Sequence, residues 1–279
     1  MITKMASSPP KIGLALSGGA ARGMAHVGVL RALTENNIPI DCIAGTSAGS
    51  IVAGAYASGM PMEDIAKFGR TLRWRDIGRV TMSKLGIQSN ERLEQYLRER
   101  LPITRFEDLT MPFAAVATDL KTNSAVVMKD QGDMCFAIRA SCTIPGWYVP
   151  VIDEQGRHLV DGGLVAVIPA VVTRSLGADI VIAVDVNSSG ATFMGSTSSV
   201  IGVLFQSMMV VQKTASSYQR QMSDVVIDPK VGHVRWDEMG RADELITAGY
   251  EAALKSMPEI RAVIDAATNK DAQQEEILA

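Results

Sequence analysis

Residues 12–49 read IGLALSGGAARGMAHVGVLRALTENNIPIDCIAGTSAG, and this stretch decides the fold. Short apolar runs at 12–16 and 40–44 each end at a glycine-rich turn. After each turn, apolar or small residues recur at helical spacing. Because strand and helix alternate in this way, the stretch predicts an α/β fold with a mostly parallel sheet.

The same alternation continues along the chain. Apolar runs predict further strands over 113–118, 124–128 and 180–186. Helical spacing predicts helices over 61–101, about 200–220 and 241–267, the last as two closing helices. We expect a single domain over 12–268, with the motifs in a core at about 12–175. The ends, 1–11 and 269–279, are expected to be loose.

The composition argues against several classes of function. The chain has 279 residues, a net charge of −3 and 5% aromatic residues, so it lacks the basic field of a nucleic-acid-binding protein. No stretch reaches the roughly 20 apolar residues of a membrane span, and the first residues lack the apolar core of a secretory signal. We expect a cytoplasmic protein whose contact with a membrane, if any, is peripheral and transient.

The cysteines argue against a metal site. Cys42, Cys135 and Cys142 are the complete set, and they form no CxxC pair. The odd number and wide spacing fit neither a disulfide framework nor a zinc site. We therefore expect reduced thiols, no metal and no cofactor.

The second glycine-rich turn carries a candidate nucleophile. Gly45-Thr46-Ser47-Ala48-Gly49 has the form G-x-S-x-G and lies between a predicted strand and a predicted helix. In this context the motif is typical of a nucleophile elbow, in which side chains at the flanking positions would clash. Ser47 would then be exposed at a helix N-terminus, where the helix dipole stabilises negative charge. The alternative is an ordinary turn with a capping serine.

The first glycine-rich turn has three interpretations. Residues 18–23, GGAARG, open a helix, and their N–H groups could hold a pyrophosphate or an oxyanion. Ala20 replaces the second glycine of the dinucleotide fingerprint, and Asp41 lies at the start of the next strand rather than at its end, which weakens the first interpretation. The third interpretation is a simple turn in which Arg22 is solvated or pairs with a surface acid.

Asp161-Gly162-Gly163 is a candidate for placing a carboxylate. The paired glycines predict positive φ directly after Asp161. Apolar pairs, 159–160 and 164–165, flank the motif and indicate that the turn is not freely exposed. The alternative is an aspartate in a surface hairpin.

The three histidines limit the choice of a general base. A Ser-His-Asp triad needs one of them, and only His233 follows Ser47 and Asp161 in the chain order of α/β-hydrolases. In that fold the elbow follows several strands, whereas here it follows the second, so we favour a site without histidine. His26 is expected to pack beside the glycine loop, and His158 precedes Asp161 by three residues.

These motifs together resemble the patatin-like phospholipases, especially the bacterial branch related to the catalytic domain of the neuropathy target esterase. The matching stretches are LSGGAARG at 16–23, AHVGVL at 25–30, GTSAG at 45–49, ASCTIP at 140–145 with Pro150, and DGG at 161–163. They occur in the order of the family, and the resemblance covers about residues 12–190.

The resemblance implies a three-layer α/β/α fold and a Ser-Asp dyad, with Ser47 as nucleophile and Asp161 as base. The oxyanion-stabilising loop would comprise Gly18, Gly19, Ala20 and Arg22. The motif-supporting glycines would be Gly23, Gly45, Gly49, Gly162 and Gly163. The family usually carries a third glycine at the position of Ala20, and an alanine is tolerable there if the residue keeps a negative φ.

The implied activity is hydrolysis of a lipid acyl ester, of the lysophospholipase or phospholipase A type, through an acyl-enzyme. Side chains for the acyl chain are expected from 74–87, 147–148 and 200–211, where Met208 and Met209 suit chains of variable length. Two other classes stay open. An acyltransferase usually uses a histidine after the elbow, and a non-catalytic adaptor need not retain Ser47, Asp161 and the glycine loop together.

Overall fold

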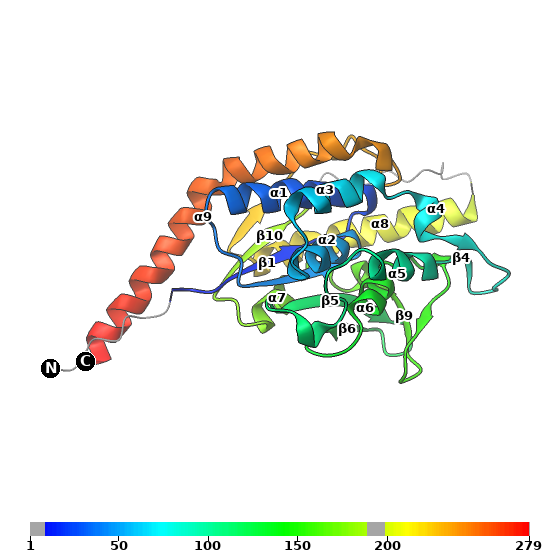
Figure 1. Ribbon diagram of the computed structural model, residues 1–279, viewed down its shortest axis with the longest axis horizontal. Helices are drawn as coiled ribbons and strands as arrows, with labels where there is room; N and C mark the ends of the chain where they lie inside the picture. The colour runs from blue at the N-terminus through cyan, green and yellow to red at the C-terminus, as the bar shows by residue number, and fades with distance from the viewer. Residues whose placement is uncertain (1–8, 189–198, 279) are drawn as a thin grey trace.

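The computed structural model describes residues 9–188 and 199–278, and within these ranges it contains an eight-stranded sheet (Figure 1). Its parallel centre has the order β11 (Val225–Ile227), β10 (Ile180–Val184), β1 (Ile12–Leu16), β2 (Cys42–Thr46) and β5 (Phe113–Asp119). The antiparallel strands beyond β5 are β9 (His158–Asp161), β8 (Val151–Ile152) and β6 (Ser124–Met128). The prediction of a mostly parallel sheet is confirmed.

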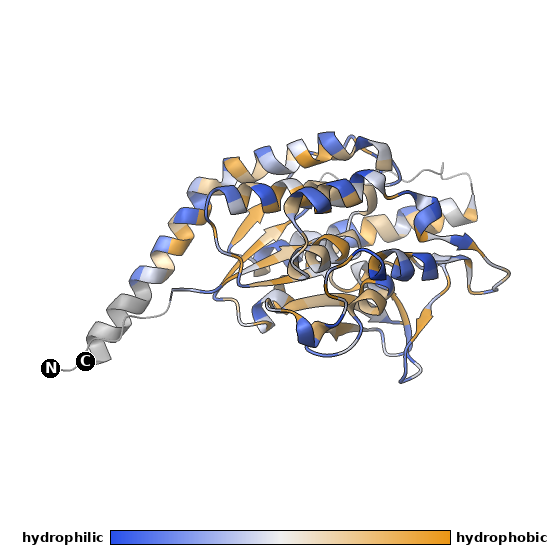
Figure 2. Ribbon diagram, viewed as in Figure 1, coloured by the Kyte–Doolittle hydropathy of each residue, from blue (hydrophilic) through white to orange (hydrophobic). Residues whose placement is uncertain are grey.

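Helices cover both faces of the sheet, which gives the three layers. In β1, Ile12, Leu14 and Leu16 join the core beneath α1 (Met24–Glu35), α3 (Met62–Thr71) and α9 (Ala242–Leu278). Ala15 joins a smaller cluster with Ala170 of α7 (Ala170–Ser175). Successive side chains of a strand point to opposite faces, so this strand is apolar throughout because both of its faces are covered. Figure 2 shows the resulting apolar sheet between helices whose outer faces are mostly polar.

The candidate motifs gather at one edge of the sheet because β1, β2 and β5 run parallel. Leu16 lies opposite Gly45, and Thr46 lies opposite Val116. The glycine loop after β1 and the turn after β2 therefore emerge next to each other at the carboxyl ends of their strands. The antiparallel strand β9 brings Asp161 to the same edge.

The prediction of helix throughout 61–101 is wrong at its centre. After α3 and the short helix α4 (Trp74–Ile77), the chain forms an antiparallel hairpin of β3 (Arg79–Val80) and β4 (Gly86–Ser89), and α5 (Glu91–Arg98) follows. β4 pairs with β7 (Gly146–Tyr148) in a separate three-stranded sheet. This pairing joins segments that are far apart in the sequence, so helical spacing within 61–101 could not reveal it.

The C-terminal part forms one helix rather than the two predicted over 241–267. α9 extends to Leu278 with Pro258 inside it, so residues 269–278, expected to be loose, are helical. In Figure 1 the first part of α9 lies along α1 and its last part extends away from the sheet. Most of the predicted leader, residues 1–8, lies outside the described residues.

The remaining long helices are α2 (Ala48–Ala57), α6 (Met134–Ser141) and α8 (Val200–Gln219), and the last matches the predicted helix at 200–220. No helix within residues 9–188 and 199–278 combines the length and the apolar character needed to cross a bilayer.

Candidate active site

Ser47 lies in a sharp turn between β2 and α2. Its backbone has φ 52° and ψ −125°, a conformation that is strained for a residue with a Cβ. A Cβ on Gly45 would lie 2.5 Å from the backbone of Gly49, and one on Gly49 would lie 2.3 Å from the carbonyl oxygen of Leu16. The turn therefore requires glycine at both positions, as predicted, and it presents Ser47 at the N-terminus of α2.

Ser47 and Asp161 form a direct hydrogen bond. Ser47 Oγ donates to Asp161 Oδ2 at 2.6 Å, and the N–H of Gly163 donates to Asp161 Oδ1 at 2.7 Å. The backbone of Asp161 is held on both sides, since its N–H donates to the carbonyl oxygen of Thr143 at 2.8 Å and its carbonyl oxygen accepts from Thr118 Oγ1 at 2.9 Å. The carboxylate therefore has a defined orientation toward the serine.

Burial makes Asp161 a stronger base than an exposed aspartate. The residue is 6% exposed, and no described lysine, arginine or histidine forms an ion pair with it. Burial raises the pKa of Asp161 to about 6, although the hydrogen bonds from Ser47 and Gly163 act in the opposite direction. A carboxylate with this pKa is ionised at neutral pH and is better matched to proton transfer there than a free aspartate.

The glycines after Asp161 have a different role from the one predicted. Positive φ was expected there, yet neither Gly162 nor Gly163 is among the described glycines with positive φ. A Cβ on Gly162 would lie 2.2 Å from the carbonyl oxygen of Val116, and one on Gly163 would lie 2.7 Å from Gln212 Nε2. Close packing against the backbone of β5, rather than backbone conformation, therefore requires glycine at position 162, whereas a side chain at position 163 would have to displace the flexible end of Gln212.

The glycine loop leaves two N–H groups available beside Ser47. The N–H of Gly18 is occupied by the carbonyl oxygen of Val167 at 3.0 Å. Among the described residues, the N–H groups of Gly19 and Ala20 have no acceptor, and both residues line a cavity together with Ser47. These two groups are the loop donors that an oxyanion could use.

Ala20 does not meet the condition under which an alanine is easily tolerated in the loop. Its φ is +47° rather than negative. An L-residue in this left-handed region is strained by roughly 1–2 kcal/mol relative to glycine. The loop thus keeps the backbone conformation that suits a third glycine while carrying an alanine.

Arg22 is buried rather than solvated. Its Nε donates to the carbonyl oxygen of Val234 at 2.6 Å, and its Nη2 donates to that of Gly232 at 2.9 Å. Burial lowers the pKa of this guanidinium. The interpretations of Arg22 as a solvated residue or a partner of a surface acid are therefore wrong, and these contacts tie the start of α1 to the segment before α9. Gly23, beside it, lies so close to Ala48 that a Cβ would come within 2.6 Å of the alanine Cβ.

The described histidines do not hydrogen-bond to Ser47 or Asp161. His233 Nε2 lies 2.6 Å from Glu244 Oε1 on the surface. His26 is fully buried with Nε2 at 2.8 Å from the carbonyl oxygen of Ser17, and burial lowers its pKa to about 4. The neutral His26 ring thus donates to the residue that precedes the glycine loop, in agreement with a supporting position.

Ser141 is part of the site although the sequence analysis assigned it no role. Its Oγ accepts from the N–H of Ser47 at 2.8 Å and donates to the carbonyl oxygen of Val116 at 2.6 Å. Ser141 thereby fixes the turn of Ser47 to β5. Ser141 lies in the 140–145 segment, and the resemblance of this segment to the family is the sequence feature that could have identified it as a site residue.

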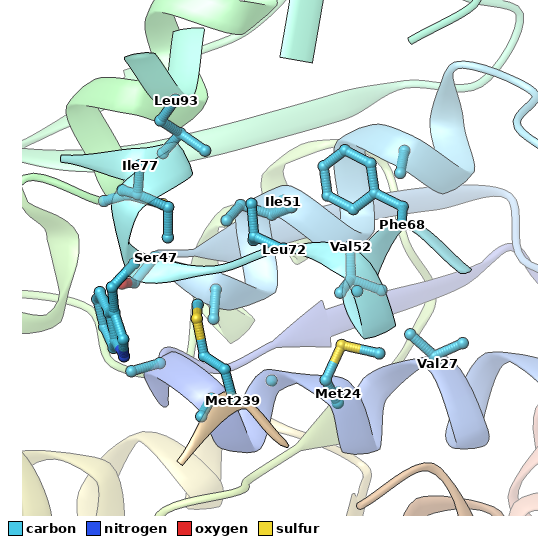
Figure 3. Close-up of a pocket in the computed structure, with 18 of the residues that line it drawn as sticks. Met24, Val27, Ser47, Ile51, Val52, Phe68, Leu72, Ile77, Leu93 and Met239 are labelled. Carbon is cyan, nitrogen blue, oxygen red and sulfur yellow. The ribbon is translucent and has the colours of Figure 1, made fainter. Parts of the chain in front are cut away.

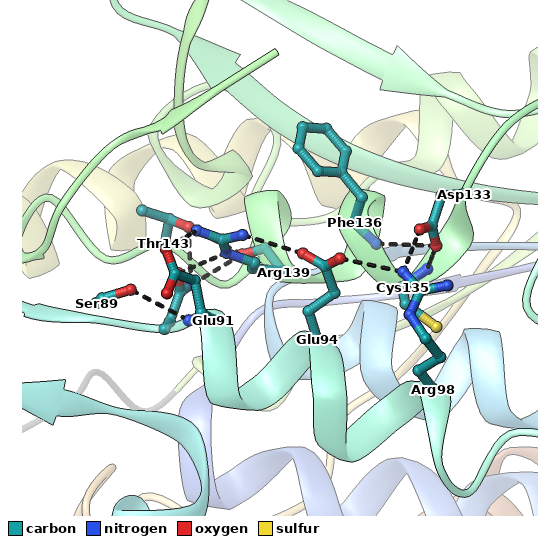
Figure 4. Close-up of polar contacts among 10 residues, drawn as sticks. Ser89, Glu91, Glu94, Arg98, Asp133, Cys135, Phe136, Arg139 and Thr143 are labelled. Carbon is teal, nitrogen blue, oxygen red and sulfur yellow. Dashed lines mark hydrogen bonds and ion pairs between the residues drawn. The ribbon is translucent and has the colours of Figure 1, made fainter. Parts of the chain in front are cut away.

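A buried polar network supports the Asp161 side of the site (Figure 4). Asn90 is fully buried, and its Nδ2 donates to Thr143 Oγ1 at 2.9 Å. Arg139 Nη1 donates to Glu94 Oε2 at 3.0 Å, and its Nε donates to Asn90 Oδ1 at 3.1 Å. The network fixes Thr143, whose carbonyl oxygen accepts the N–H of Asp161. Contacts between α5 and α6 form it, so it could not be read from local sequence.

Two cavities meet at Ser47. The first lies between α1, α2 and α3 (Figure 3). Its lining is apolar apart from the serine and includes Met24, Val27, Val52, Phe68 and Leu72, and also Trp74, Ile77 and Tyr148 from two of the segments expected to hold an acyl chain.

The second cavity lies beneath α8, and Asp161 is among its lining residues. Phe205, Met208 and Met209 provide its apolar wall, and Gln212 and Asn187 add amide groups. Ser47 therefore has an apolar space on one side and a more polar space on the other.

A metal site is not evident in the described parts of the chain. Within residues 9–188 and 199–278, no three His, Cys, Asp or Glu side chains come together in a way that could hold a metal ion. The three cysteines are buried and unpaired.

Comparisons with known proteins identify relatives of this chain. The family model of the patatin-like phospholipases matches residues 14–173. An uncharacterized NTE family protein of Mycobacterium tuberculosis is 38% identical over 188 residues, which cover 66% of this chain and 51% of the relative. The lysophospholipase NTE1 of Mycosarcoma maydis is 39% identical over 185 residues, covering 63% of this chain and 10% of that protein. The chain thus spans about half of the length of the mycobacterial relative.

Solved structures share the fold at low sequence identity. VipD from Legionella pneumophila superposes with a TM-score of 0.52 and 14% identity, covering 90% of this chain and 67% of VipD. Human GIVD cytosolic phospholipase A2 superposes with a TM-score of 0.50 and 13% identity, covering 94% of this chain and 60% of the human one.

Proposed function

Because this chain belongs to the patatin-like phospholipase family, we propose that it hydrolyses acyl esters of lipids with Ser47 as nucleophile and Asp161 as general base. The observation that carries the proposal is the 2.6 Å hydrogen bond between the two side chains where the two cavities meet. We assign the reaction to one patatin-like domain over residues 12–268. The substrate class is a lysophospholipid or a phospholipid.

The first step forms the acyl-enzyme. Asp161 Oδ2 accepts the Ser47 proton while Ser47 Oγ bonds to the ester carbonyl carbon, and the carbonyl electron pair moves to its oxygen. The N–H groups of Gly19 and Ala20 and the N-terminus of α2 stabilise the resulting oxyanion. When the carbonyl re-forms, the bond to the alcohol oxygen breaks, and the alcohol takes the proton from Asp161.

The second step releases the fatty acid. Water enters where the alcohol has left and gives a proton to Asp161 as its oxygen attacks the acyl carbon. A second oxyanion forms at the same N–H groups, and its collapse breaks the bond to Ser47 Oγ, which recovers its proton from Asp161. Both steps use the same base, so no histidine is required.

The cavities suit the two parts of such an ester. The first cavity has no charged lining residue and would take the acyl chain, because transfer of apolar surface from water favours binding there. The second cavity offers Gln212 and Asn187 beside its apolar wall and would take the alcohol part. This assignment places the ester bond at Ser47.

The other two classes have less support. The acyltransferase alternative called for a histidine, but His233 pairs with Glu244 on the surface. An adaptor has no need of a strained serine held against a buried carboxylate, and retention of that strain favours an enzyme.

Labelling with a fluorophosphonate probe tests the nucleophile. We expect one covalent adduct on Ser47, identified by peptide mass spectrometry, because the probe reacts with activated serines. Ser47→Ala should lose the adduct, whereas Ser58→Ala, at the other end of α2, should keep it. Undiminished labelling of Ser47→Ala would show that the nucleophile is elsewhere.

A further inference from the structure

Exposed apolar side chains gather on two elements near the active-site cavities. One is the hairpin at 79–89, whose strand β4 pairs with β7, which carries Tyr148 of the first cavity, and the other is α8, which lines the second cavity. In the hairpin at 79–89, Met82 is fully exposed and Val80 is 75% exposed, and Leu85 and Ile87 are also exposed. On α8, Val200 is 77% exposed and Leu204 is 64% exposed, and Val203, Val210 and Val211 are exposed as well. We call these nine residues the apolar patch. Exposed apolar groups of this extent usually mark an interaction site.

α8 is apolar on both of its faces. Phe205, Met208 and Met209 line the second cavity, while the patch residues of α8 face solvent. A surface helix of a soluble protein normally carries charged residues on its outer face. Lys213 is the only charged residue among the twenty of α8, so the outer face is suited to an apolar environment rather than to water.

The hairpin and α8 are connected through β7. β4 of the hairpin pairs with β7, and the ring of Trp147 on β7 contacts the ring of Phe205 on α8 with a centroid distance of 6.3 Å. Figure 1 shows the hairpin and the first turns of α8 at the same end of the molecule. The two parts of the patch are therefore linked through β7, which also carries Tyr148 of the first cavity.

The charge around the hairpin differs from that of the whole chain. Segment 73–89 has a net charge of +3, because it contains four basic residues and a single acidic one, Asp76, whereas the chain has −3. The basic residues are exposed, and they are Arg73, Arg75, Arg79 and Lys84. Basic side chains beside exposed apolar ones are the combination that anionic membrane surfaces attract.

We propose that the hairpin at 79–89 and the outer face of α8 dock the protein on a membrane that contains anionic lipids. The apolar side chains enter the boundary between headgroups and acyl chains, and the basic residues of the hairpin contact the headgroups. Docked in this way, the protein has the entrance to its active site next to the lipid. The biological reason for docking rests on the proposed lipid hydrolysis, but the docking itself does not require the reaction.

Vesicle flotation with Ser47→Ala protein tests the docking without hydrolysis. We expect stronger binding to phosphatidylcholine vesicles with about 30 mol% phosphatidylglycerol than to pure phosphatidylcholine, and weaker binding at high salt. In this background, Met82→Ser with Leu85→Ser, and separately Leu204→Ser with Val211→Ser, should each lower the partition coefficient about tenfold or more. Arg79→Gln with Lys84→Gln should remove the preference for phosphatidylglycerol.

The matched control is Val171→Ser with Leu254→Ser, which removes exposed apolar side chains from α7 and α9, away from the patch. This control should bind as the parent does. With Ser47 intact, the patch variants should hydrolyse a soluble short-chain nitrophenyl ester at the parent rate and vesicle lipid at a reduced rate.

Three results would overturn the docking proposal. The parent could fail to float with anionic vesicles, or the patch variants could float as well as the parent. Light scattering could also show a dimer that the α8 variant loses, with no vesicle binding, which would make the patch an interface between copies. Absence of nitrophenyl ester hydrolysis by the unmodified chain would instead overturn the proposed function and leave the binding result intact.

Discussion

At the scale of single residues, burial and strain distinguish the site from ordinary turns. Ser47 and Ala20 both have positive φ, and both line the two cavities of the site. Asp161 is buried, and no cation among the described residues forms an ion pair with it, so its carboxylate is less stabilised than a surface one. Strain and an unpaired buried acid both cost stability, and their presence together indicates a site that the fold holds in place for chemistry.

Hydrolysis should depend on the ionisation of Asp161. Its pKa is raised to about 6, and only the carboxylate can accept the serine proton. We therefore expect kcat/KM for a soluble ester to rise with pH through an inflection near 6 and then to level off. Asp161→Asn should lower the rate by a factor on the order of 10² to 10⁴ and abolish the inflection.

The histidines provide the control for this experiment. His233→Ala and His158→Ala should retain most of the activity and the same inflection. A His233→Ala protein that is folded by circular dichroism but as inactive as Ser47→Ala would contradict the dyad.

Replacing Ala20 by glycine should relieve strain in the loop. At φ +47° the alanine Cβ is unfavourable, so we expect Ala20→Gly to raise the free energy of unfolding by about 1 kcal/mol in urea denaturation. Ala21→Gly is the matched control, because Ala21 is not among the described residues with positive φ, and it should be neutral or destabilising. If Ala20→Gly lowers the free energy of unfolding as much as Ala21→Gly does, the left-handed conformation of Ala20 does not strain the loop.

At the scale of secondary-structure elements, α1 and α9 approach so closely that their backbones touch. A Cβ on Gly28 would lie 1.9 Å from the carbonyl oxygen of Ile246, and a Cβ on Gly249 would lie 1.9 Å from that of Ala25. The glycine loop ends directly before α1, and Arg22 ties it to the segment before α9. The position of the loop therefore depends on the contact between these helices.

Gly249→Ala should force α1 and α9 apart. The backbone atoms that its Cβ meets cannot move aside as a flexible side chain would, so we expect a loss of about 2–3 kcal/mol in the free energy of unfolding. Gly240→Ala is the control, because a Cβ there meets no atom within 4 Å among the described residues. Equal stability of the two variants would show that the helices can separate at no cost.

At this scale, the strands that pair with a neighbour in the sequence were predicted, and elements that depend on contacts with distant segments were missed. Strands at 113–118 and 124–128 were predicted within a residue of β5 and β6, because a polar turn joins them and they pair with each other. The hairpin at 79–89 was missed because β4 pairs with β7, which follows much later in the chain. Two closing helices were predicted over 241–267, whereas the structure has the single helix α9, with Pro258 inside it.

At the scale of the whole molecule, the site lies where the layers meet. Side chains of α1, α2 and α3 line the first cavity, and side chains of α8 line the second. The packing of these helices therefore sets the size of the space for substrate. Gly69 of α3 and Met24 of α1 meet in the first cavity, where a Cβ on Gly69 would lie 2.0 Å from the Met24 sulfur. The flexible end of Met24 can move from this position, and the cavity is the space next to it.

Gly69→Ala should therefore narrow the acyl cavity. We expect the ratio of kcat/KM for a long-chain nitrophenyl ester to that for the butyrate ester to fall about tenfold, because a displaced Met24 excludes part of the longer chain. Gly69→Ala combined with Met24→Ala should restore the ratio. An unchanged ratio in Gly69→Ala would show that the acyl chain does not bind between α1 and α3.

The sequence by itself determined the fold class, the order of the motifs and the identity of Ser47 and Asp161 as the residues to test. It could do so because strand and helix periods and the sharp G-x-S-x-G turn are local properties, and because the motifs together resemble those of the patatin-like phospholipases. The tertiary structure decided which loop N–H groups are unoccupied, where Arg22 points, why glycines follow Asp161 and where the cavities lie. Each of these depends on contacts between segments distant in the chain and on how completely those contacts exclude water, and local sequence carries no record of either.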